Sequence, residues 1–125
     1  MKITAAAFVT GVMLVSASAY AQQSLSGRYT GNYVVYTAKG PTPVGLTLVI
    51  DSVEGVVVKG TATSYGRTCG GDFPIEGQFK DNKLQLSSTT KGGSAGDCIW
   101  QLNLTVEGNK LTGTTGLGNA VQLSK

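Results

Sequence analysis

The residues of this sequence that could do chemistry are concentrated around one cysteine, in the stretch YGRTCGGD at Tyr65–Asp72. Cys69 stands among three glycines and close to both a basic and an acidic side chain. Such a cysteine could be a reactive thiol, a metal ligand, part of an anion-binding loop or half of a disulfide. The chain contains one other cysteine, Cys98, and no histidine.

The lack of histidine weighs against the first two alternatives. A catalytic thiol is usually paired with a base that helps to form the thiolate, and a zinc site needs four ligands, which two cysteines cannot supply. A phosphate loop would need a GK[ST] ending and a helix behind it, and neither follows GRTCGG or KGGSAGD. We therefore expect a Cys69–Cys98 disulfide, which closes a loop of about 30 residues and would stabilise the fold by roughly 3–4 kcal/mol.

This disulfide would bring the carboxylates of Asp72 and Asp97 to one rim, because each lies within three residues of a bridged cysteine. Glycosidases use a pair of carboxylates, and calcium sites use carboxylate oxygens. However, aspartate is also a common turn residue, and the sequence contains no calcium-loop motif and no nucleophile–base pair. The sequence therefore predicts a protein that is not an enzyme and that uses no metal or cofactor.

The first 21 residues have the form of a bacterial-type signal peptide: Lys2, the apolar stretch ITAAAFVTGVMLVSA, and Ala19-Tyr20-Ala21 as a cleavage site. An uncleaved anchor helix is the alternative. Cleavage after Ala21 would leave a single domain, residues 22–125, without a membrane anchor, in the periplasm or outside the cell, where disulfides persist. The formal net charge of +3 falls by one when Lys2 is removed. This weak charge, with no basic cluster, argues against a nucleic-acid partner.

Apolar and polar residues alternate with period two along most of the remaining chain, which predicts an all-β protein. The predicted strands are Gly27–Thr37, Val44–Val53, Val56–Ser64, Phe73–Lys80, Lys83–Thr90, Cys98–Val106, Lys110–Thr115 and Ala120–Ser124. Three similar hairpins in series favour an eight-stranded antiparallel up-and-down meander closed into a barrel, which leaves no open edge. A two-sheet sandwich is the alternative.

The expected inward residues are large, so we expect a packed core with at most a shallow mouth. They are Leu46, Leu48, Ile50, Val56, Val58, Ile75, Phe79, Leu84, Leu86, Trp100, Leu102, Leu104, Val106, Leu111, Val121 and Leu123. Of the three tyrosines of the first strand, Tyr29 and Tyr33 share one face and Tyr36 takes the other.

The connections between the predicted strands differ in length. In a meander, successive connections alternate between the two ends of the barrel, so the longer loops Lys39–Pro43, Tyr65–Asp72 and Lys91–Asp97 would all lie at one end. Loops longer than closure requires often carry function, and Tyr and Arg dominate binding hot spots. The candidate binding residues are Lys39, Tyr65, Arg67, Asp72, Lys91 and Asp97.

The opening Gly27-x-Tyr29 of the first strand, the exported start and the eight short strands resemble the calycin group of lipocalins and avidins. The signature of that group is G-x-W, and Tyr29 stands in place of the tryptophan. The resemblance covers most of the domain in architecture and two residues in motif. It implies a small β-barrel that binds apolar or vitamin-like ligands. Small disulfide-tied barrels that inhibit lysozyme and proteases are similar too.

The function expected from these observations is that of an exported, non-enzymatic binding protein. Its disulfide-tied loop end would recognise a protein partner, for example as an inhibitor of a secreted or periplasmic hydrolase. The alternative is a small-molecule carrier that binds an apolar or vitamin-like ligand in the barrel mouth. A structural protein of the cell envelope is a third interpretation.

Overall fold

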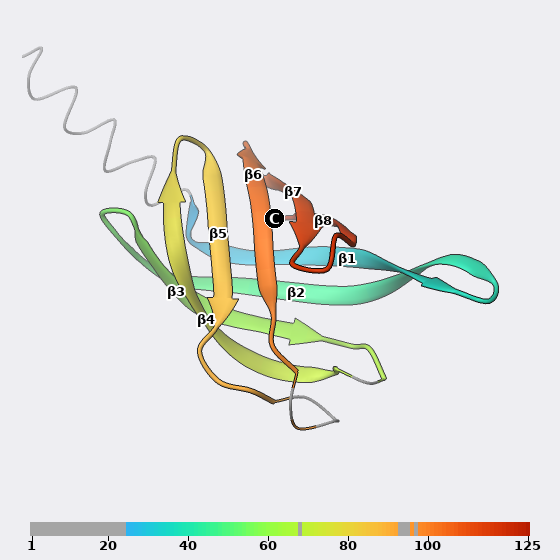
Figure 1. Cartoon of the computed structure of the whole chain (residues 1–125). Coiled ribbons are helices and arrows are strands. Elements are labelled where there is room, and N and C mark those ends of the chain that lie inside the picture. Colours follow the sequence, from blue (N-terminus) through green and yellow to red (C-terminus); the bar gives the residue numbers. More distant parts are fainter. Residues whose placement is uncertain (1–24, 68, 93–95, 97) are drawn as a thin grey trace, which may run out of the picture.

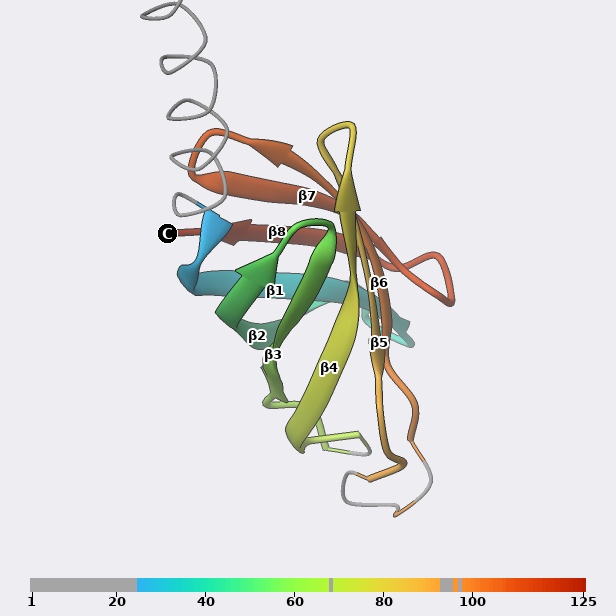
Figure 2. The same ribbon diagram turned by 90° about the vertical axis from the view of Figure 1, so that its left-hand side faces the viewer.

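The chain folds into a closed eight-stranded antiparallel barrel in which each strand pairs with the next and β8 pairs with β1. The computed structural model describes residues 25–67, 69–92, 96 and 98–125. The strands are β1 (Gly27–Thr37), β2 (Gly40–Glu54), β3 (Val57–Ser64), β4 (Gly71–Lys80), β5 (Lys83–Ser88), β6 (Gln101–Glu107), β7 (Lys110–Thr115) and β8 (Ala120–Ser124). Figure 1 and Figure 2 show the strands curving round a common interior. The predicted meander barrel is confirmed, and the predicted signal peptide, residues 1–21, lies outside the described residues.

The strand boundaries follow the sequence pattern closely, with two informative exceptions. β1, β7 and β8 have the predicted bounds, whereas β6 begins at Gln101 because Cys98 forms only an isolated bridge with Gly92. The larger difference is in β2, which begins at Gly40 instead of Val44. The predicted loop at residues 39–43 is therefore wrong: the chain turns at residues 38–39 and re-enters the sheet at once.

The early start of β2 creates a hairpin arm at residues 34–44 that projects beyond the barrel (Figure 1). β1 pairs with β8 only through Thr30–Tyr33, and β2 pairs with β3 only from Leu46 onward. The arm therefore pairs with itself alone, with Pro41 opposite Tyr36 and Pro43 opposite Val34. Proline is tolerated there because no third strand needs the missing N–H groups.

The barrel interior is filled by side chains, as eight short strands with large inward residues predict. The buried apolar residues include Tyr29, Leu48, Val58, Leu84 and Leu111, each with no measurable exposure. One predicted inward residue is wrong: Val56 is 48% exposed, because it forms the β2–β3 turn together with Gly55. Phe79 and Val106 are partly buried against the core. The predicted split of the tyrosines holds, since Tyr29 and Tyr33 are buried and Tyr36 is 77% exposed.

Two strand glycines lie in close contact with the backbone of a neighbouring strand. A Cβ atom added to Gly77 would meet the backbone oxygen of Gln85, and one added to Gly31 would meet that of Gln122. Neither oxygen belongs to a movable side chain, so only glycine fits at these positions. These glycines therefore permit a close approach of neighbouring strands that no other residue would allow.

One end of the barrel is closed by the two ends of the domain. The Tyr29 hydroxyl donates a hydrogen bond to the Leu25 carbonyl oxygen at 2.7 Å, and the Lys125 ammonium lies 5.4 Å from the centroid of the Tyr29 ring. Burial raises the pKa of the Tyr29 hydroxyl above its ordinary value of 10.0. The short turns after β2, β4 and β6 lie at this closed end, which we call the turn end. The connections after β1, β3, β5 and β7 lie at the opposite loop end.

Candidate functional site: the mouth of the barrel

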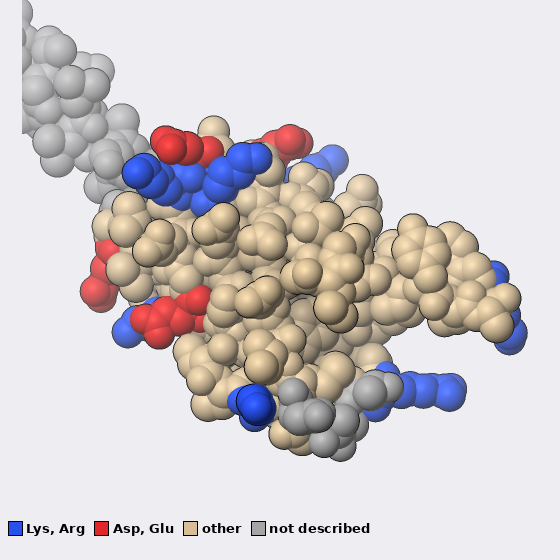
Figure 3. All heavy atoms as spheres, viewed as in Figure 1, with Lys and Arg blue, Asp and Glu red and all other residues tan. Residues whose placement is uncertain are grey.

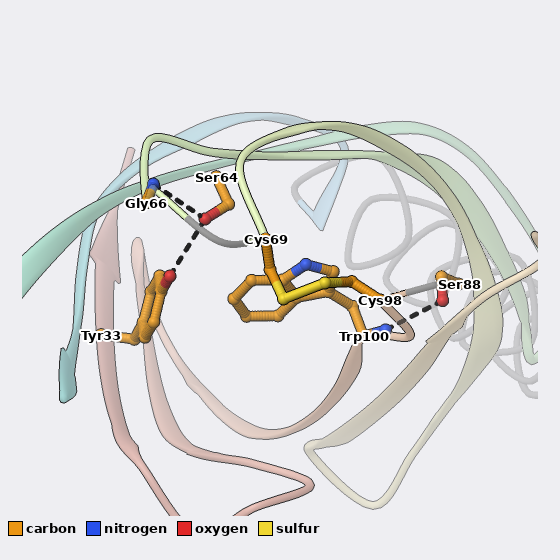
Figure 4. Close-up of a disulfide and its surroundings, with 7 residues drawn as sticks. All are labelled: Tyr33, Ser64, Gly66, Cys69, Ser88, Cys98 and Trp100. Atoms are coloured by element: carbon orange, nitrogen blue, oxygen red, sulfur yellow. Dashed lines mark hydrogen bonds between the residues drawn. A yellow bond between two sulfur atoms is a disulfide. The ribbon is translucent and has the colours of Figure 1, made fainter. Parts of the chain in front are cut away.

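The predicted disulfide is present at the loop end. Cys69 in the β3–β4 connection and Cys98 ahead of β6 are joined by an S–S bond of 2.06 Å, with their Cα atoms 5.7 Å apart. The bond ties two connections through cysteines that are 29 positions apart in the sequence, and Figure 4 shows it together with the Trp100 side chain. A disulfide is consistent with the predicted oxidising location, the periplasm or the exterior of the cell.

A cavity of about 380 Å³ opens at the loop end. Its lining residues are Tyr33, Val35, Val44, Gly66, Arg67, Cys69, Ile99, Trp100, Thr115, Leu117 and Asn119. Most of the described lining is apolar or aromatic, and Arg67 is the one charged residue among these described residues. Val35 and Val44 belong to the arm, so the arm forms one side of the cavity beyond the barrel wall.

Two aromatic rings form the floor of the cavity. Tyr33 and Trp100 are each 7% exposed, and their ring centroids lie 5.0 Å apart with an interplanar angle of 80°. Phe73 supports Trp100 from the core side at a centroid distance of 6.0 Å. Such edge-to-face pairs contribute about 0.5–1.5 kcal/mol beyond the area that they bury. The floor is therefore a packed aromatic layer that separates the cavity from the core.

Hydrogen bonds fix this floor in place (Figure 4). The Tyr33 hydroxyl lies 3.1 Å from the Ser64 Oγ, which also accepts a bond from the Gly66 N–H at 3.3 Å. The backbone N–H of Trp100 donates to the Ser88 Oγ at 2.9 Å. Ser64 and Ser88 are the last residues of β3 and β5. Their hydroxyls form hydrogen bonds with Tyr33, Gly66 and Trp100, which all line the cavity.

The indole N–H of Trp100 is the one buried side-chain polar group without a hydrogen-bond partner in the part of the chain that the structure describes. A buried donor without an acceptor costs about 1–3 kcal/mol. Trp100 carries this cost at the floor of the cavity. A functional site is where such a cost is expected to persist.

The wall formed by the β7–β8 connection is tied to the arm. Asn119 donates from Nδ2 to the Val34 carbonyl oxygen at 2.9 Å. Its own backbone N–H donates to the Thr115 Oγ1 at 3.1 Å, and the Thr115 hydroxyl donates to the Asn119 Oδ1 at 3.2 Å. Leu117 belongs to the same β7–β8 connection; it is 94% exposed and lines the edge of the cavity.

The predicted binding residues divide between the cavity and its outer surface. Of the five that the structure describes, Arg67 alone lines the cavity. Tyr65 lies on the outer wall, where its N–H donates to the Gly45 oxygen at 3.1 Å and its ring covers Gly45. Asp72 accepts a hydrogen bond from the Thr63 hydroxyl at 2.7 Å. Lys39 is exposed in the turn of the arm and Lys91 is exposed in the β5–β6 connection. Asp97 lies outside the described residues.

Sequence reasoning missed the apolar rim of the mouth. Ile99 is 59% exposed beside the buried Trp100, and an outward isoleucine next to an inward tryptophan was a signal for it. Leu117 is a large apolar residue between two glycines in a short connection, which was a second signal. No feature of the sequence indicated that Val35 and Val44 would line the cavity, because this position depends on how far the arm extends beyond the barrel.

The site offers binding groups and no set of groups for metal chemistry. No cluster of three or more His, Cys, Asp or Glu side chains that could hold a metal ion occurs among residues 25–67, 69–92, 96 and 98–125. Over the same residues, no helix has the length and apolar character needed to span a bilayer. What the arrangement can do chemically is to surround an apolar group and to place one guanidinium beside it.

Comparisons with protein families, curated proteins and solved structures find no match for this chain. The closed antiparallel barrel is compatible with the calycin-like architecture that the sequence resembles, at the level of strand number and topology.

Proposed function

We propose that the protein is an exported, non-enzymatic binding protein that holds a small ligand, by its apolar part, in the mouth cavity. The observation that carries this proposal is the cavity of about 380 Å³ above the Tyr33–Trp100 floor. Ligand sites are typically concave and mostly apolar, with volumes of about 300–1,000 Å³. An engineered cavity of about 150 Å³ binds benzene, so this cavity has room for a larger apolar group.

The surroundings of the cavity support ligand binding in a second way. The disulfide and the Asn119 bonds hold three of the connections that frame it. A site whose walls are fixed before binding loses less conformational entropy when the ligand enters. This rigidity favours a preformed pocket over an ordinary group of solvated loops.

A second candidate function is recognition of a protein partner at the loop end, for example a secreted or periplasmic hydrolase that the protein inhibits. The exposed large side chains of Tyr65, Ile99 and Leu117 favour it, because apolar groups that gather on a surface often mark an interface. In that case a side chain of the partner would enter the cavity that a small ligand would otherwise occupy.

Filling the cavity tests the leading proposal. Isothermal titration with decan-1-ol, an uncharged apolar probe, should give saturable one-to-one binding to the wild-type protein. Val35→Phe places a larger side chain in the cavity lining and should weaken binding at least tenfold, with the melting temperature little changed. Val57→Phe, at an exposed position of the turn end, is the matched control and should bind like the wild type. The absence of wild-type binding, or equal binding by Val35→Phe, would overturn the proposal.

Affinity capture separates the second candidate from the first. A protein partner retained from the host's envelope fraction by the wild type, lost with a Tyr65→Ala/Arg67→Ala double variant and kept with Val56→Ala, would support rim recognition. Capture that is equal for all three proteins would exclude the loop end as the docking surface.

A further inference from the structure

The described carboxylates are distributed unequally between the two ends of the barrel. Most of the described carboxylates lie in or near the turns of the turn end or in the middle of β4: Asp51, Glu54, Glu76, Asp81 and Glu107. The loop end carries Lys39, Arg67 and Lys91, and of the described carboxylates only Asp72, which is bonded to Thr63. In Figure 3 the acidic side chains lie toward the left and the top, and the coloured side chains at the lower right are basic. The turn end also carries cations, namely Arg28, Lys59, Lys80, Lys83, Lys110 and Lys125, so both signs are mixed there. Among the described residues the loop end therefore has few carboxylates, and its charged side chains are mainly basic.

Within the cavity, one described residue supplies the positive charge. Arg67 is the single charged side chain among the described residues of the lining, and it makes no hydrogen bond or ion pair with another described residue. A guanidinium stays protonated at any physiological pH and presents donors in a planar fork that matches a carboxylate or a phosphate. Arg67 is also exposed, whereas Tyr33 and Trp100 are buried. The site therefore runs from an apolar floor to a cationic rim.

From this arrangement we infer that the ligand is an anionic amphiphile. Its apolar part lies on Tyr33 and Trp100, and its terminal anionic oxygen group, such as a carboxylate, pairs with Arg67 at the rim. This inference rests on the proposed function, because it names the class of ligand for the same cavity. The cost of removing water from the anionic group sets the orientation of the ligand. An anionic group at the rim keeps part of its hydration shell, whereas the same group at the floor would lose that shell at a large cost in free energy.

The same chemistry occurs in a free organic acid and in the headgroup of an anionic lipid within a bilayer. The aromatic floor limits the depth of the cavity, and its volume of about 380 Å³ is small for a two-chain lipid. The free single-chain acid is therefore the favoured form. Decanoate below its micellar concentration and vesicles of phosphatidylglycerol are the two probes that distinguish these sources.

The fluorescence of Trp100 reports binding directly, because the chain contains one tryptophan and this residue lines the cavity. Titrations at pH 7.5 compare decanoate, decan-1-ol and decylammonium, which share a chain length and differ in head charge. Partly exposed ion pairs are worth up to about 1 kcal/mol, so decanoate should bind about fivefold more tightly than decan-1-ol. Decylammonium should bind more weakly than either, and added salt should weaken decanoate alone.

Variants assign the preference to Arg67. In Arg67→Gln the ratio of decanoate to decan-1-ol affinity should fall to within twofold of unity. Arg67→Lys should restore part of the preference, since it keeps the charge and loses the fork. Lys110→Gln, which removes an exposed cation from the turn end, is the matched control and should keep the wild-type ratio.

The outcomes separate this inference from the proposal on which it rests. Equal wild-type affinities for decanoate and decan-1-ol, or an unchanged ratio in Arg67→Gln, would refute the anionic ligand and leave the apolar cavity standing. If neither probe binds, the proposed function and this inference fail together. A response to phosphatidylglycerol vesicles without any response to decanoate would replace the free acid with a membrane surface and would overturn the inference.

Discussion

Tyr33 and Trp100 meet edge to face with their ring centroids 5.0 Å apart, and together they separate the packed core from the open mouth of the barrel. Tyr33 comes from β1 and Trp100 from the segment just ahead of β6, so the contact spans the barrel interior between strands that are not neighbours. The same two rings belong to the hydrophobic core and also line the cavity. A substitution in this layer should therefore change both the free energy of unfolding and the affinity for a ligand, and the two changes can differ in size.

The unpartnered indole N–H makes Trp100→Phe the most informative substitution in this layer. The change removes a buried donor without an acceptor, which recovers about 1–3 kcal/mol, and it loses apolar ring area of a similar value. We expect the free energy of unfolding to change by less than about 1 kcal/mol, as measured by urea denaturation with circular dichroism. Leu102→Ala, in the core, should cost about 2–5 kcal/mol. A loss of 3 kcal/mol or more in Trp100→Phe would show that the indole N–H has an acceptor.

The Cys69–Cys98 bridge should contribute to both folding and binding. The double variant Cys69→Ser/Cys98→Ser should lose about 2–5 kcal/mol of unfolding free energy. It should also bind decan-1-ol more weakly, because two of the connections that frame the cavity are no longer tied to each other. Titration below the melting transition separates the two effects. An affinity equal to that of the wild type would mean that the bridge does not organise the mouth.

Asn119 should hold the wall of the mouth without contributing much to the core. Asn119→Ala loses the bond to the Val34 carbonyl oxygen and the bond that Oδ1 accepts from the Thr115 hydroxyl, so we expect a loss of about 1–2 kcal/mol in unfolding free energy. The affinity for decan-1-ol should fall severalfold as the β7–β8 connection loosens. Asn103→Ala, exposed on β6, is the control for removal of an amide. Equal affinities in the two variants would contradict this role.

The buried Tyr29 hydroxyl should make the fold sensitive to alkaline pH. Its pKa is raised by burial above the ordinary value of 10.0, so the folded state holds this proton more tightly than the unfolded state does. The resulting stability is fully present below about pH 10 and is lost as the pH rises through the folded pKa. Denaturation between pH 8 and pH 11 should show this fall. Tyr29→Phe should flatten it, whereas Tyr36→Phe, at an exposed site, should not.

Most of the barrel could be predicted from the sequence because period-two alternation fixes both the strand and the side of the sheet that each residue faces. The pairing of Cys69 with Cys98 followed from there being two cysteines in a chain with a signal-like start. The arm could not be predicted, since Pro41 and Pro43 are typical of loops and only the lack of a third strand makes them acceptable in β2.

The site could be predicted only in part, for a related reason. Arg67 was identified because it stands beside the disulfide in a longer connection. The cavity depends on how far the arm rises beyond the barrel and on which connections approach it, and both are properties of the closed barrel. Tyr65 illustrates the limit: it belongs to the same connection as Arg67, yet its ring lies over Gly45 on the outer wall.

The most direct test of the account is the response of the indole N–H of Trp100 in a ¹H–¹⁵N correlation spectrum during titration with decan-1-ol. The chain has one tryptophan, so this signal is a single reporter for the floor of the cavity, and the amide of Gly66 reports on its wall. We predict that both signals shift saturably with one-to-one stoichiometry, while the amides of the Asp81–Asn82 turn stay in place. Shifts confined to the turn end, or no shift at the mouth, would contradict the claim that the mouth cavity is the binding site.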